Sequence, residues 1–384
     1  MSAADAPAAG GTLLITGGGG YVGGQIVRAA LEAGHGVRAT VRTAGAAARL
    51  AAQLGPLGRP GQLRTSLVPD MTDASGYAGA FAAEAGDGDG DGEASDGGGV
   101  VAVIHAASPF VLAPDDVVRD LLDPAVRGAT AILDAVRRFG RGRVRRVVAT
   151  SSITAVLDLT KGLRPGYTYT EKDWNPVTWD EAVAGDGKTA YSASKTLAER
   201  AMWAWMAEHG GEAGAGFALT TLCPPWVFGP YAHALRGTGA WLSESVRLLD
   251  GMLDASAVPA FDFGGCVDGR DLGAAHVAAA TTAPRAAVAG RRFLVGYTYS
   301  HQRALDLARA ELPALAARLP AGTPGRWDDA YAVDGSEAAR VLGVAYRPLA
   351  DTIRDSFVQL LQARELEAAD RAKAEAEAEA ETRA

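Results

Sequence analysis

The feature that most constrains the fold is a regular alternation of strand-like and helix-like segments through the first half of the chain. Short strand-like segments lie at residues 12–16, 36–41, 62–68, 100–104 and 143–150, and helical patterns separate most of them. Such alternation is typical of a parallel sheet covered by helices on both faces. The sequence therefore predicts an α/β fold built around a parallel sheet.

A glycine-rich turn joins the first of these strands to the first helix. Its spacing is G-x-x-G-x-x-G, at Gly17, Gly20 and Gly23. Glycines let the backbone approach a pyrophosphate, and the free N–H groups and dipole of the helix favour its charge. We expect Tyr21 and Val22 to join these glycines in the phosphate site. An ordinary strand-to-helix turn is the alternative, but its position after the first strand favours nucleotide binding.

The residue after the second strand predicts which cofactor is bound. An Asp or Glu about 20 residues beyond the glycines would bind the ribose hydroxyls of NAD. Arg42 stands there instead, and a guanidinium suits a 2′-phosphate and stacks on adenine. The sequence therefore predicts NADP(H), with a solvated surface arginine as the alternative.

Two later strand ends are expected to contact the same cofactor. Asp70 and Met71 follow the third strand, where the carboxylate could reach the adenine amine. The small residues Ala106, Ala107 and Ser108 follow the fourth strand and would lie against ribose and phosphate. We interpret the preceding residue, His105, as a packed strand-end side chain.

A Y-x-x-x-K pair supplies the candidate catalytic group. Tyr191 and Lys195 are four residues apart in a helical segment and so share one face. An ammonium beside a phenol is expected to lower the phenol pKa from about 10, and the tyrosine can then exchange a proton with a carbonyl oxygen. A surface tyrosine and lysine would be the interpretation of this pair alone.

The fifth strand ends in two serines that could complete the site. Carboxyl ends of parallel strands are where ligands bind in this architecture. We expect the Ser152 hydroxyl to hold the substrate oxygen near Tyr191, and Ser151 is the alternative.

The predicted organisation has four parts. Residues 1–10 are expected to be a disordered leader, 11–223 an NADP-binding Rossmann domain, 224–362 a smaller, mostly helical substrate-binding region, and 363–384 a low-complexity helical tail. Helices are predicted at 21–33, 189–209, 240–250, 272–283, 301–312, 336–342 and 349–364, and strands at 218–222 and 291–295 that could return to the sheet. The Gly/Asp-rich stretch 86–99 resembles a calcium loop, but Gly98 occupies the position that requires glutamate, so we expect an acidic insertion and no metal site.

Composition excludes several classes of function. The net charge of −8 without a basic stripe argues against nucleic acid as a partner. The longest apolar runs are too short and interrupted for a membrane helix. Two cysteines imply no disulfide framework, so a cytoplasmic location is expected. The protein is expected to be a monomer or a homodimer.

Several stretches together resemble the extended short-chain dehydrogenase/reductase superfamily, in particular its dihydroflavonol reductase, cinnamoyl-CoA reductase and fungal methylglyoxal (aldehyde) reductase branch. They are Val37-Arg38-Ala39-Thr40-Val41-Arg42, Val103-Ile104-His105-Ala106-Ala107-Ser108-Pro109, Arg146-Val147-Val148-Ala149-Thr150-Ser151-Ser152, Glu171-Lys172-Asp173-Trp174-Asn175, Tyr191 to Lys195, Val227-Phe228-Gly229-Pro230 and Val267-Asp268-Gly269-Arg270-Asp271. They occur in the family order over about residues 12 to 360.

The resemblance implies roles for particular residues. Ser152 would polarise the carbonyl, Tyr191 would donate the proton and Lys195 would tune it, while Pro224 to Val227 would lie along the nicotinamide. The chain departs from the family where a second phosphate-binding lysine is often found, since that position is Ala46. The acidic insertion is a further departure.

An apolar substrate pocket is expected between the sheet edge and the C-terminal region. Its candidate walls are Phe110, Ile153, Trp226, Phe228 and Tyr231, each of which could equally be a core residue.

The function predicted from the sequence is an NADPH-dependent carbonyl reductase that reversibly converts a ketone or aldehyde to an alcohol at a Ser-Tyr-Lys site. One alternative is an NAD-dependent nucleotide-sugar epimerase or dehydratase, which Arg42 disfavours. The other is a non-catalytic NADP(H)-sensing protein, which the intact Ser-Tyr-Lys set disfavours.

Overall fold

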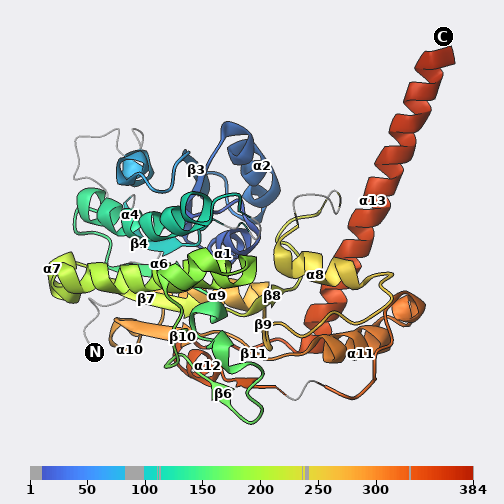
Figure 1. Cartoon of the computed structure of the whole chain (residues 1–384). Coiled ribbons are helices and arrows are strands. Elements are labelled where there is room, and N and C mark those ends of the chain that lie inside the picture. The colour runs from blue at the N-terminus through green and yellow to red at the C-terminus, as the bar shows by residue number, and fades with distance from the viewer. Residues whose placement is uncertain are drawn as a thin grey trace.

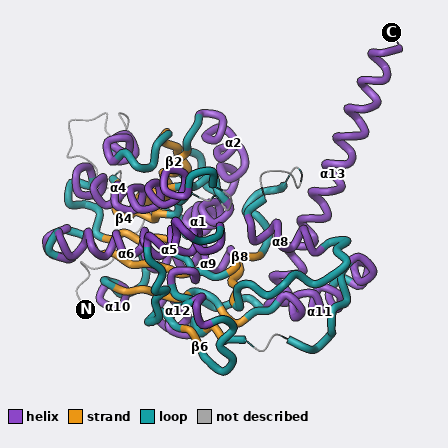
Figure 2. The backbone as a smooth tube through the Cα atoms, viewed as in Figure 1, coloured by secondary structure: helices purple, strands orange, loops and turns teal. Residues whose placement is uncertain are grey.

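Seven parallel strands form the central sheet of the protein, in the order β3-β2-β1-β4-β5-β7-β10 (Figures 1 and 2). The computed structural model describes residues 11–82, 99–109, 111, 114–235, 237, 242–327 and 330–383. The strands are β1 (Thr12–Thr16), β2 (Gly36–Val41), β3 (Leu63–Leu67), β4 (Val100–His105), β5 (Arg146–Thr150), β7 (Ala218–Cys223) and β10 (Arg291–Leu294). The strand order reverses between β1 and β4, which opens a crevice at their carboxyl ends.

Helices cover both faces of this sheet because side chains alternate along each strand. They are α1 (Tyr21–Glu32), α2 (Ala44–Leu54), α3 (Ala78–Phe81), α4 (Asp123–Phe139), α5 (Trp179–Ala184), α6 (Gly187–Glu208), α7 (Gly211–Ala215), α9 (Gly269–Ala280) and α10 (Arg285–Val288). Leu13 and Ile15 of β1 pack in a core with α1 and α9. Leu14, between them, packs in a second core with α4 and α6 on the opposite face.

The C-terminal part builds a smaller lobe beside the sheet. Its strands are β8 (Trp226–Phe228), β9 (Gly265–Asp268) and β11 (Tyr297–Thr298), which form a three-stranded sheet, and β12 (Ala332–Val333), which pairs with β6 (Thr168–Tyr169). Its helices are α8 (Glu244–Met252), α11 (His301–Glu311), α12 (Ser336–Leu342) and α13 (Leu349–Arg383). The far end of α13 projects away from the rest of the molecule (Figure 1).

Single helical turns complete the backbone. Short 3₁₀ turns lie at Gly55–Leu57, Ala74–Tyr77, Ile153–Ala155, Leu159–Lys161 and Pro313–Arg318, and a π turn at Val118–Leu122. The turn at Ile153–Ala155 follows β5 directly and becomes part of the candidate site.

The structure confirms the predicted doubly wound parallel sheet and the return of two late strands to it. Several predicted bounds were wrong for local reasons. The strand predicted from residue 143 begins at Arg146, because a turn with positive φ at Arg141 and Gly142 precedes it. The helix predicted from 240 begins at Glu244, where Ser243 caps its N-terminus.

Further differences lie later in the chain. The helix predicted at 272–283 begins at Gly269 and ends at Ala280, because Asp268 caps it. The helix predicted at 349–364 and the predicted helical tail are one continuous helix that reaches Arg383. The five strands β6, β8, β9, β11 and β12 were not predicted, since strands of two to four residues carry no readable alternation.

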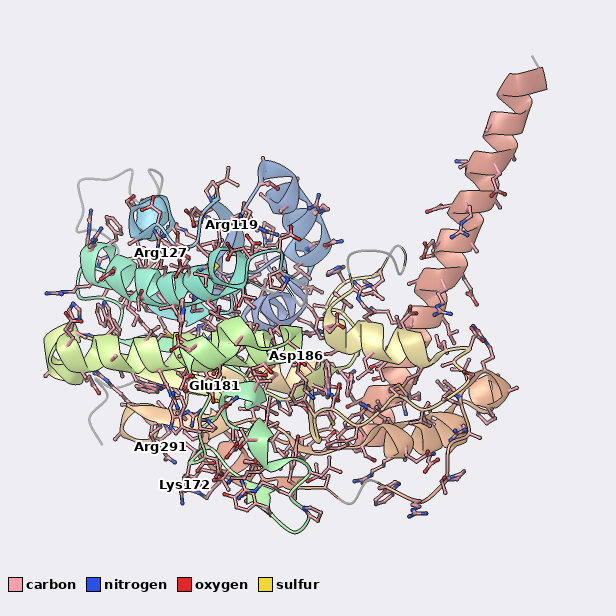
Figure 3. All side chains as sticks on the ribbon, in the orientation of Figure 1. Arg119, Arg127, Lys172, Glu181, Asp186 and Arg291 are labelled. Atoms are coloured by element: carbon pink, nitrogen blue, oxygen red, sulfur yellow. The ribbon has the colours of Figure 1, made fainter. Side chains whose placement is uncertain are left out.

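Many charged side chains lie on the outside of the molecule, and Arg127, Glu181 and Asp186 are examples (Figure 3). None of the helices in the described part of the chain is both long enough and apolar enough to cross a membrane. The leader, residues 86–98 of the acidic insertion and Phe110 lie outside the described residues, so the predictions made for them stay predictions.

Candidate active site

The glycine turn lies at the carboxyl end of β1, beside the segment that follows β4. Gly17 has a φ of +69°, and a Cβ on it would lie 2.9 Å from the Ala107 backbone. A Cβ on Gly23 would overlap the Gly17 carbonyl oxygen. Gly20 caps α1 without a side-chain hydrogen bond, and no acidic residue lies in the first turn of α1. The turn therefore presents backbone N–H groups and a helix N-terminus, the arrangement that binds phosphate.

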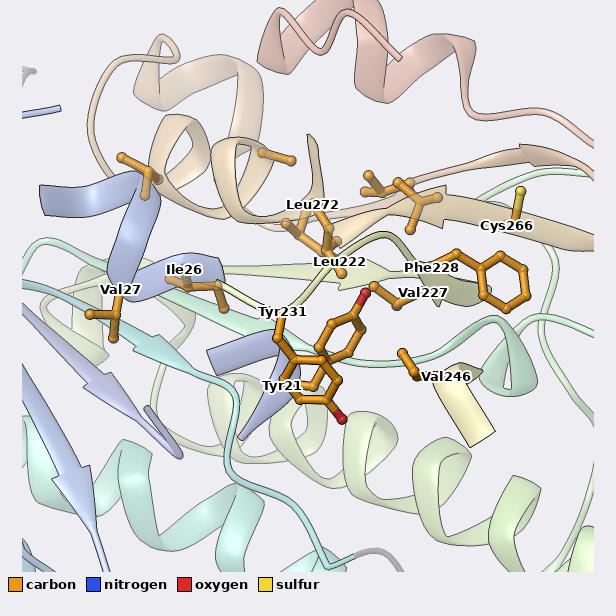
Figure 4. Packing of buried hydrophobic residues seen from close by; sticks show 14 of the residues in the cluster. Tyr21, Ile26, Val27, Leu222, Val227, Phe228, Tyr231, Val246, Cys266 and Leu272 are labelled. Atoms are coloured by element: carbon orange, nitrogen blue, oxygen red, sulfur yellow. The ribbon is translucent and has the colours of Figure 1, made fainter. Parts of the chain in front are cut away.

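Tyr21 and Val22 contribute backbone to this turn, and the Tyr21 side chain points elsewhere. Its hydroxyl donates to the Gly229 carbonyl at 2.7 Å, and its ring lies 4.5 Å from that of Tyr231. The Tyr21 side chain therefore joins the turn to the C-terminal lobe (Figure 4).

Arg42 is exposed immediately after β2, at the same edge of the sheet. The next residue, Thr43, caps α2 by accepting a hydrogen bond from the Ala46 N–H at 3.2 Å. Arg42 is therefore exposed to solvent at the edge of the sheet where the glycine turn lies. The sequence contains no Asp or Glu between Glu32 and Asp70.

Asp70 and Met71 follow β3. The Asp70 Oδ1 accepts hydrogen bonds from the Thr72 backbone N–H and hydroxyl, both at 2.8 Å, and these bonds lower the pKa of the Asp70 carboxyl. Met71 is half-buried and packs against Gly128 of α4.

The segment after β4 is held to β1 by side-chain hydrogen bonds. The Thr16 hydroxyl accepts from the Ala107 N–H at 3.1 Å and pairs with the His105 Nδ1 at 2.8 Å. His105 is buried, and desolvation, followed by the nearby charge of Lys195, lowers its pKa to about 4. His105 is thus a neutral packing residue, as the sequence indicated.

Helix α6 presents Tyr191 and Lys195 on one face, one turn apart. The Lys195 Nζ donates to the Ser108 hydroxyl at 2.6 Å and lies 5.5 Å from the centroid of the Tyr191 ring. Burial lowers the pKa of Lys195 to about 8.

The pKa of Tyr191 differs in direction from the expectation. Burial raises it to about 12, a hydrogen bond with the Ser152 side chain opposes this, and the charge of Glu244 adds to it. The expectation that the Tyr191 pKa is lowered was wrong, because burial disfavours both the Tyr191 phenolate and the Lys195 ammonium. The Lys195 ammonium is hydrogen-bonded to Ser108 instead. Tyr191 is therefore held in its protonated form.

The two serines after β5 have different partners. Ser152 caps the Ile153–Ala155 turn by accepting from the Thr154 N–H at 3.2 Å, and its side chain lies close enough to Tyr191 to act against the rise in the phenol pKa. The Ser151 hydroxyl instead donates to the Glu199 Oε2 at 2.6 Å. Of the two hydroxyls left open by the sequence, Ser152 is the one beside Tyr191.

A small cavity of about 30 Å³ lies behind this cluster, between β4, β5 and α6. His105, Ser108, Ser151, Lys195 and Glu199 are among its lining residues. A larger hollow of about 380 Å³ between α1 and α9 is lined by none of the predicted site residues. Ser152 and Tyr191 line neither of these two cavities.

The segment after β7 closes the site from the other side. The Pro224 carbonyl accepts from the Ile153 N–H at 2.8 Å, which ties this segment to the turn after Ser152. Val227 is buried on β8, next to β9.

The predicted pocket walls have different surroundings in the structure. Phe228 is fully buried against Tyr299, and the Tyr231 hydroxyl accepts from the Ser243 N–H at 2.6 Å, so both are core residues (Figure 4). Ile153 is buried in a separate cluster. Trp226 is half-buried and its Nε1 donates to Asp262 at 3.2 Å.

Glu199 and Arg292 form a buried ion pair behind the site that the sequence analysis did not predict. The available signal was the position of Glu199, one helical turn after Lys195 on the same face of α6.

Both cysteines are free and buried, and no group of three or more metal-binding side chains occurs within the described ranges.

Comparison with known proteins finds one matching family and several similar reductases. Residues 13–296 match the NAD dependent epimerase/dehydratase family. An NADPH-dependent methylglyoxal reductase of Saccharomyces cerevisiae is 34% identical over 268 residues, covering 68% of this chain and 76% of the yeast protein. A ketoreductase of Aspergillus niger is 32% identical over 359 residues, covering 91% of this chain and 97% of that protein.

Solved structures agree with these relatives. The crystal structure of a yeast methylglyoxal/isovaleraldehyde reductase complexed with NADPH superposes with a TM-score of 0.78 at 29% identity, covering 91% of this chain and 98% of that chain.

Proposed function

Because the chain belongs to the NAD dependent epimerase/dehydratase family, we propose that it is an NADPH-dependent carbonyl reductase that converts a ketone or aldehyde to an alcohol. The observation that carries the proposal is the cluster of Ser152, Tyr191 and Lys195 at the carboxyl edge of the sheet, beside the glycine turn. The resemblance to a methylglyoxal reductase and a ketoreductase supports the same reaction class.

The residues of the cofactor site fit a dinucleotide with a 2′-phosphate. A Cβ at Gly17 would crowd the Ala107 backbone and a Cβ at Gly23 would overlap the Gly17 carbonyl oxygen, so glycine at both positions keeps the turn tight enough for its backbone to approach a pyrophosphate. The N-terminus of α1 carries no capping side chain. The exposed Arg42 suits the additional phosphate. The residues that would hold the cofactor are Gly17, Gly20, Tyr21, Val22, Gly23, Arg42, Asp70, Met71, Ala106, Ala107, Ser108, Tyr191, Lys195, Pro224 and Val227.

Bound NADPH supplies the hydride, and the protein supplies the proton. Ser152 donates a hydrogen bond to the carbonyl oxygen, which prepares that oxygen to carry negative charge. Tyr191, held protonated by burial, transfers its phenolic proton to the same oxygen. Lys195, with a pKa of about 8, then returns a proton to the phenolate and regains one from solvent.

The substrate side of the proposal rests on the apolar surroundings. Ile153 and Trp226 remain the proposed walls, because Ile153 directly follows Ser152 and Trp226 is only half-buried, whereas Phe228 and Tyr231 pack away in the main core. An apolar wall favours carbonyl compounds with aliphatic or aromatic bulk over phosphorylated ones.

The test is oxidation of NADPH and NADH by the purified protein, followed by cofactor absorbance, against a panel of aldehydes and ketones. We expect turnover that prefers NADPH and falls by a factor of about 10² to 10⁴ in Tyr191→Phe, the range of general acid catalysis. Tyr297→Phe is the control, since its hydroxyl bonds the Arg347 carbonyl in the C-terminal lobe.

Two results would contradict the proposal. Undiminished turnover in Tyr191→Phe would remove Tyr191 from the reaction. Absence of turnover with either cofactor, together with tightly held NAD in the purified protein, would favour an epimerase or dehydratase, the alternative that the family description supports.

A further inference from the structure

A buried ion pair lies directly behind the Ser-Tyr-Lys cluster. The side chains of Glu199 and Arg292 are 1% and 9% exposed, and the Arg292 Nε donates to the Glu199 Oε1 at 2.7 Å. Glu199 follows Lys195 by one turn of α6 and lines the same small cavity. Removing two charges from water is costly unless both groups are fully hydrogen-bonded. The hydrogen-bond partners of Glu199 and Arg292 therefore show which segments the pair joins.

The Glu199 carboxylate joins α6 to the strands beneath it. Its Oε2 accepts from the Ser151 hydroxyl, which follows β5, at 2.6 Å, and its Oε1 accepts from the Thr221 hydroxyl of β7 at 2.6 Å. The Trp203 Nε1 donates to Oε1 at 3.2 Å from the next turn of α6. The helix that carries Tyr191 is thereby tied to the strand end that carries Ser152.

Arg292 uses all five of its N–H donors in the same network. Two go to Glu199, from Nε at 2.7 Å and Nη2 at 3.1 Å. The other three go to the backbone carbonyls of Ala155, Glu171 and Asp173 at 3.3, 2.9 and 2.7 Å. The guanidinium also lies 3.5 Å over the Trp174 ring, so the pair is saturated and packed.

Ser152 stands between two fixed points of this network. The preceding residue, Ser151, is held through its side chain by Glu199, and Ala155, at the end of the following turn, is held through its carbonyl by Arg292. The Ser152 side chain is the one of the two serines that acts on the pKa of Tyr191. We propose that Glu199 is a positioning residue that sets Ser152 against Tyr191, acting through the Ser151 hydroxyl; this rests on the proposed reductase function.

The same geometry separates the roles of the two serines. The Ser151 proton is directed into the Glu199 carboxylate and is not offered to a substrate oxygen. Ser152 is the polarising hydroxyl, and Ser151 is the link that orients it.

The test removes one hydroxyl at a time. Replacing Glu199 itself would leave the Arg292 guanidinium buried without its carboxylate and would threaten folding. Ser151→Ala and Thr221→Val are a matched pair, because each deletes one 2.6 Å hydrogen bond to Glu199 and leaves the ion pair intact. Ser152→Ala is measured beside them. For each variant we would determine kcat and KM for an aldehyde that the protein reduces, KM for NADPH, and the thermal midpoint of unfolding.

The expected result is a split between the matched variants. Ser151→Ala lowers kcat about tenfold or more, since small misplacements of reacting groups are costly, and leaves KM for NADPH unchanged. Thr221→Val loses a similar amount of thermal stability and keeps its kcat. Ser152→Ala loses more kcat than Ser151→Ala.

Three outcomes would overturn the inference. Equal kcat losses in Ser151→Ala and Thr221→Val would mean that the network acts only on stability, while the reductase function stands. A larger loss in Ser151→Ala than in Ser152→Ala would make Ser151 the polarising group. A wild-type protein that reduces no carbonyl compound would overturn the proposed function and the inference with it.

Discussion

Burial, more than charge pairing, sets the pKa values of Tyr191 and Lys195. Tyr191 and Lys195 lie on one helix face, yet the phenol pKa is raised to about 12 and the ammonium pKa is lowered to about 8. Both shifts have desolvation as their largest cause, which disfavours the charged form of each group. At neutral pH, Tyr191 is therefore protonated. Lys195, beside it, loses its proton as the pH rises through about 8.

This arrangement predicts the pH dependence of the reaction. Lys195 must be protonated to return a proton to Tyr191, so carbonyl reduction at saturating NADPH is expected to slow as the pH rises through about 8. Tyr191 remains protonated there and contributes no limb of its own. The measurement is kcat against pH in the reductive direction. A rate that stays level through that region would exclude Lys195 as the proton source.

At the scale of elements, the glycine turn shows how backbone space decides a site. Two adjacent glycines of α1 differ sharply in their surroundings. A Cβ at Gly23 would overlap the Gly17 carbonyl oxygen, whereas a Cβ at Gly24 would meet its nearest atoms at 3.9 Å, an ordinary contact.

We therefore expect opposite effects from the same substitution at neighbouring positions. Gly23→Ala forces the turn apart and should strongly weaken NADPH binding. Gly24→Ala should retain binding and gain up to about 1 kcal/mol of stability, because alanine is the better helix residue. Cofactor fluorescence titration and thermal unfolding measure both effects. Equal NADPH affinity in the two variants would contradict a pyrophosphate site at this turn.

Elements differ in how well the sequence predicts them. The sheet strands from β1 to β5 were recognised because strand-like segments alternate with helical patterns through this part of the chain, and α12 was predicted at its observed bounds. The short strands of the C-terminal lobe were missed, since pairs such as β12 with β6 join residues more than 160 positions apart. Their pairing depends on tertiary contacts and leaves no local periodicity.

At the scale of the whole molecule, α13 has a buried half and an exposed half. Phe357, Leu360 and Ala363 are fully buried in the main core, and the Ser356 hydroxyl accepts from the Gly229 N–H at 2.8 Å. Beyond Leu366 the described side chains are mostly exposed, and this part of the helix projects outward (Figure 1). One helix thus serves as packing for the lobe and as a solvated extension.

Shortening the chain tests this division. Ending the protein after Arg371 removes a segment in which every described side chain is exposed, so the free energy of unfolding should change by less than about 0.5 kcal/mol and activity should persist. Ending it after Asp355 removes the buried half and should prevent stable folding, because several core side chains are lost together. Chemical denaturation of both proteins is the measurement. A large loss in the longer protein would place structural contacts in the projecting segment.

By itself, the sequence determined the sheet class, the glycine turn, and the pairing of Tyr191 with Lys195, because each depends on spacing within one element or between neighbouring elements. Only the tertiary structure decided which serine faces Tyr191, in which direction the phenol pKa moves, and that Glu199 and Arg292 hold the site from behind. Those properties arise from burial and from contacts among β5, α6, β7 and β10. Residues far apart in the chain produce them, and no local pattern records their distances.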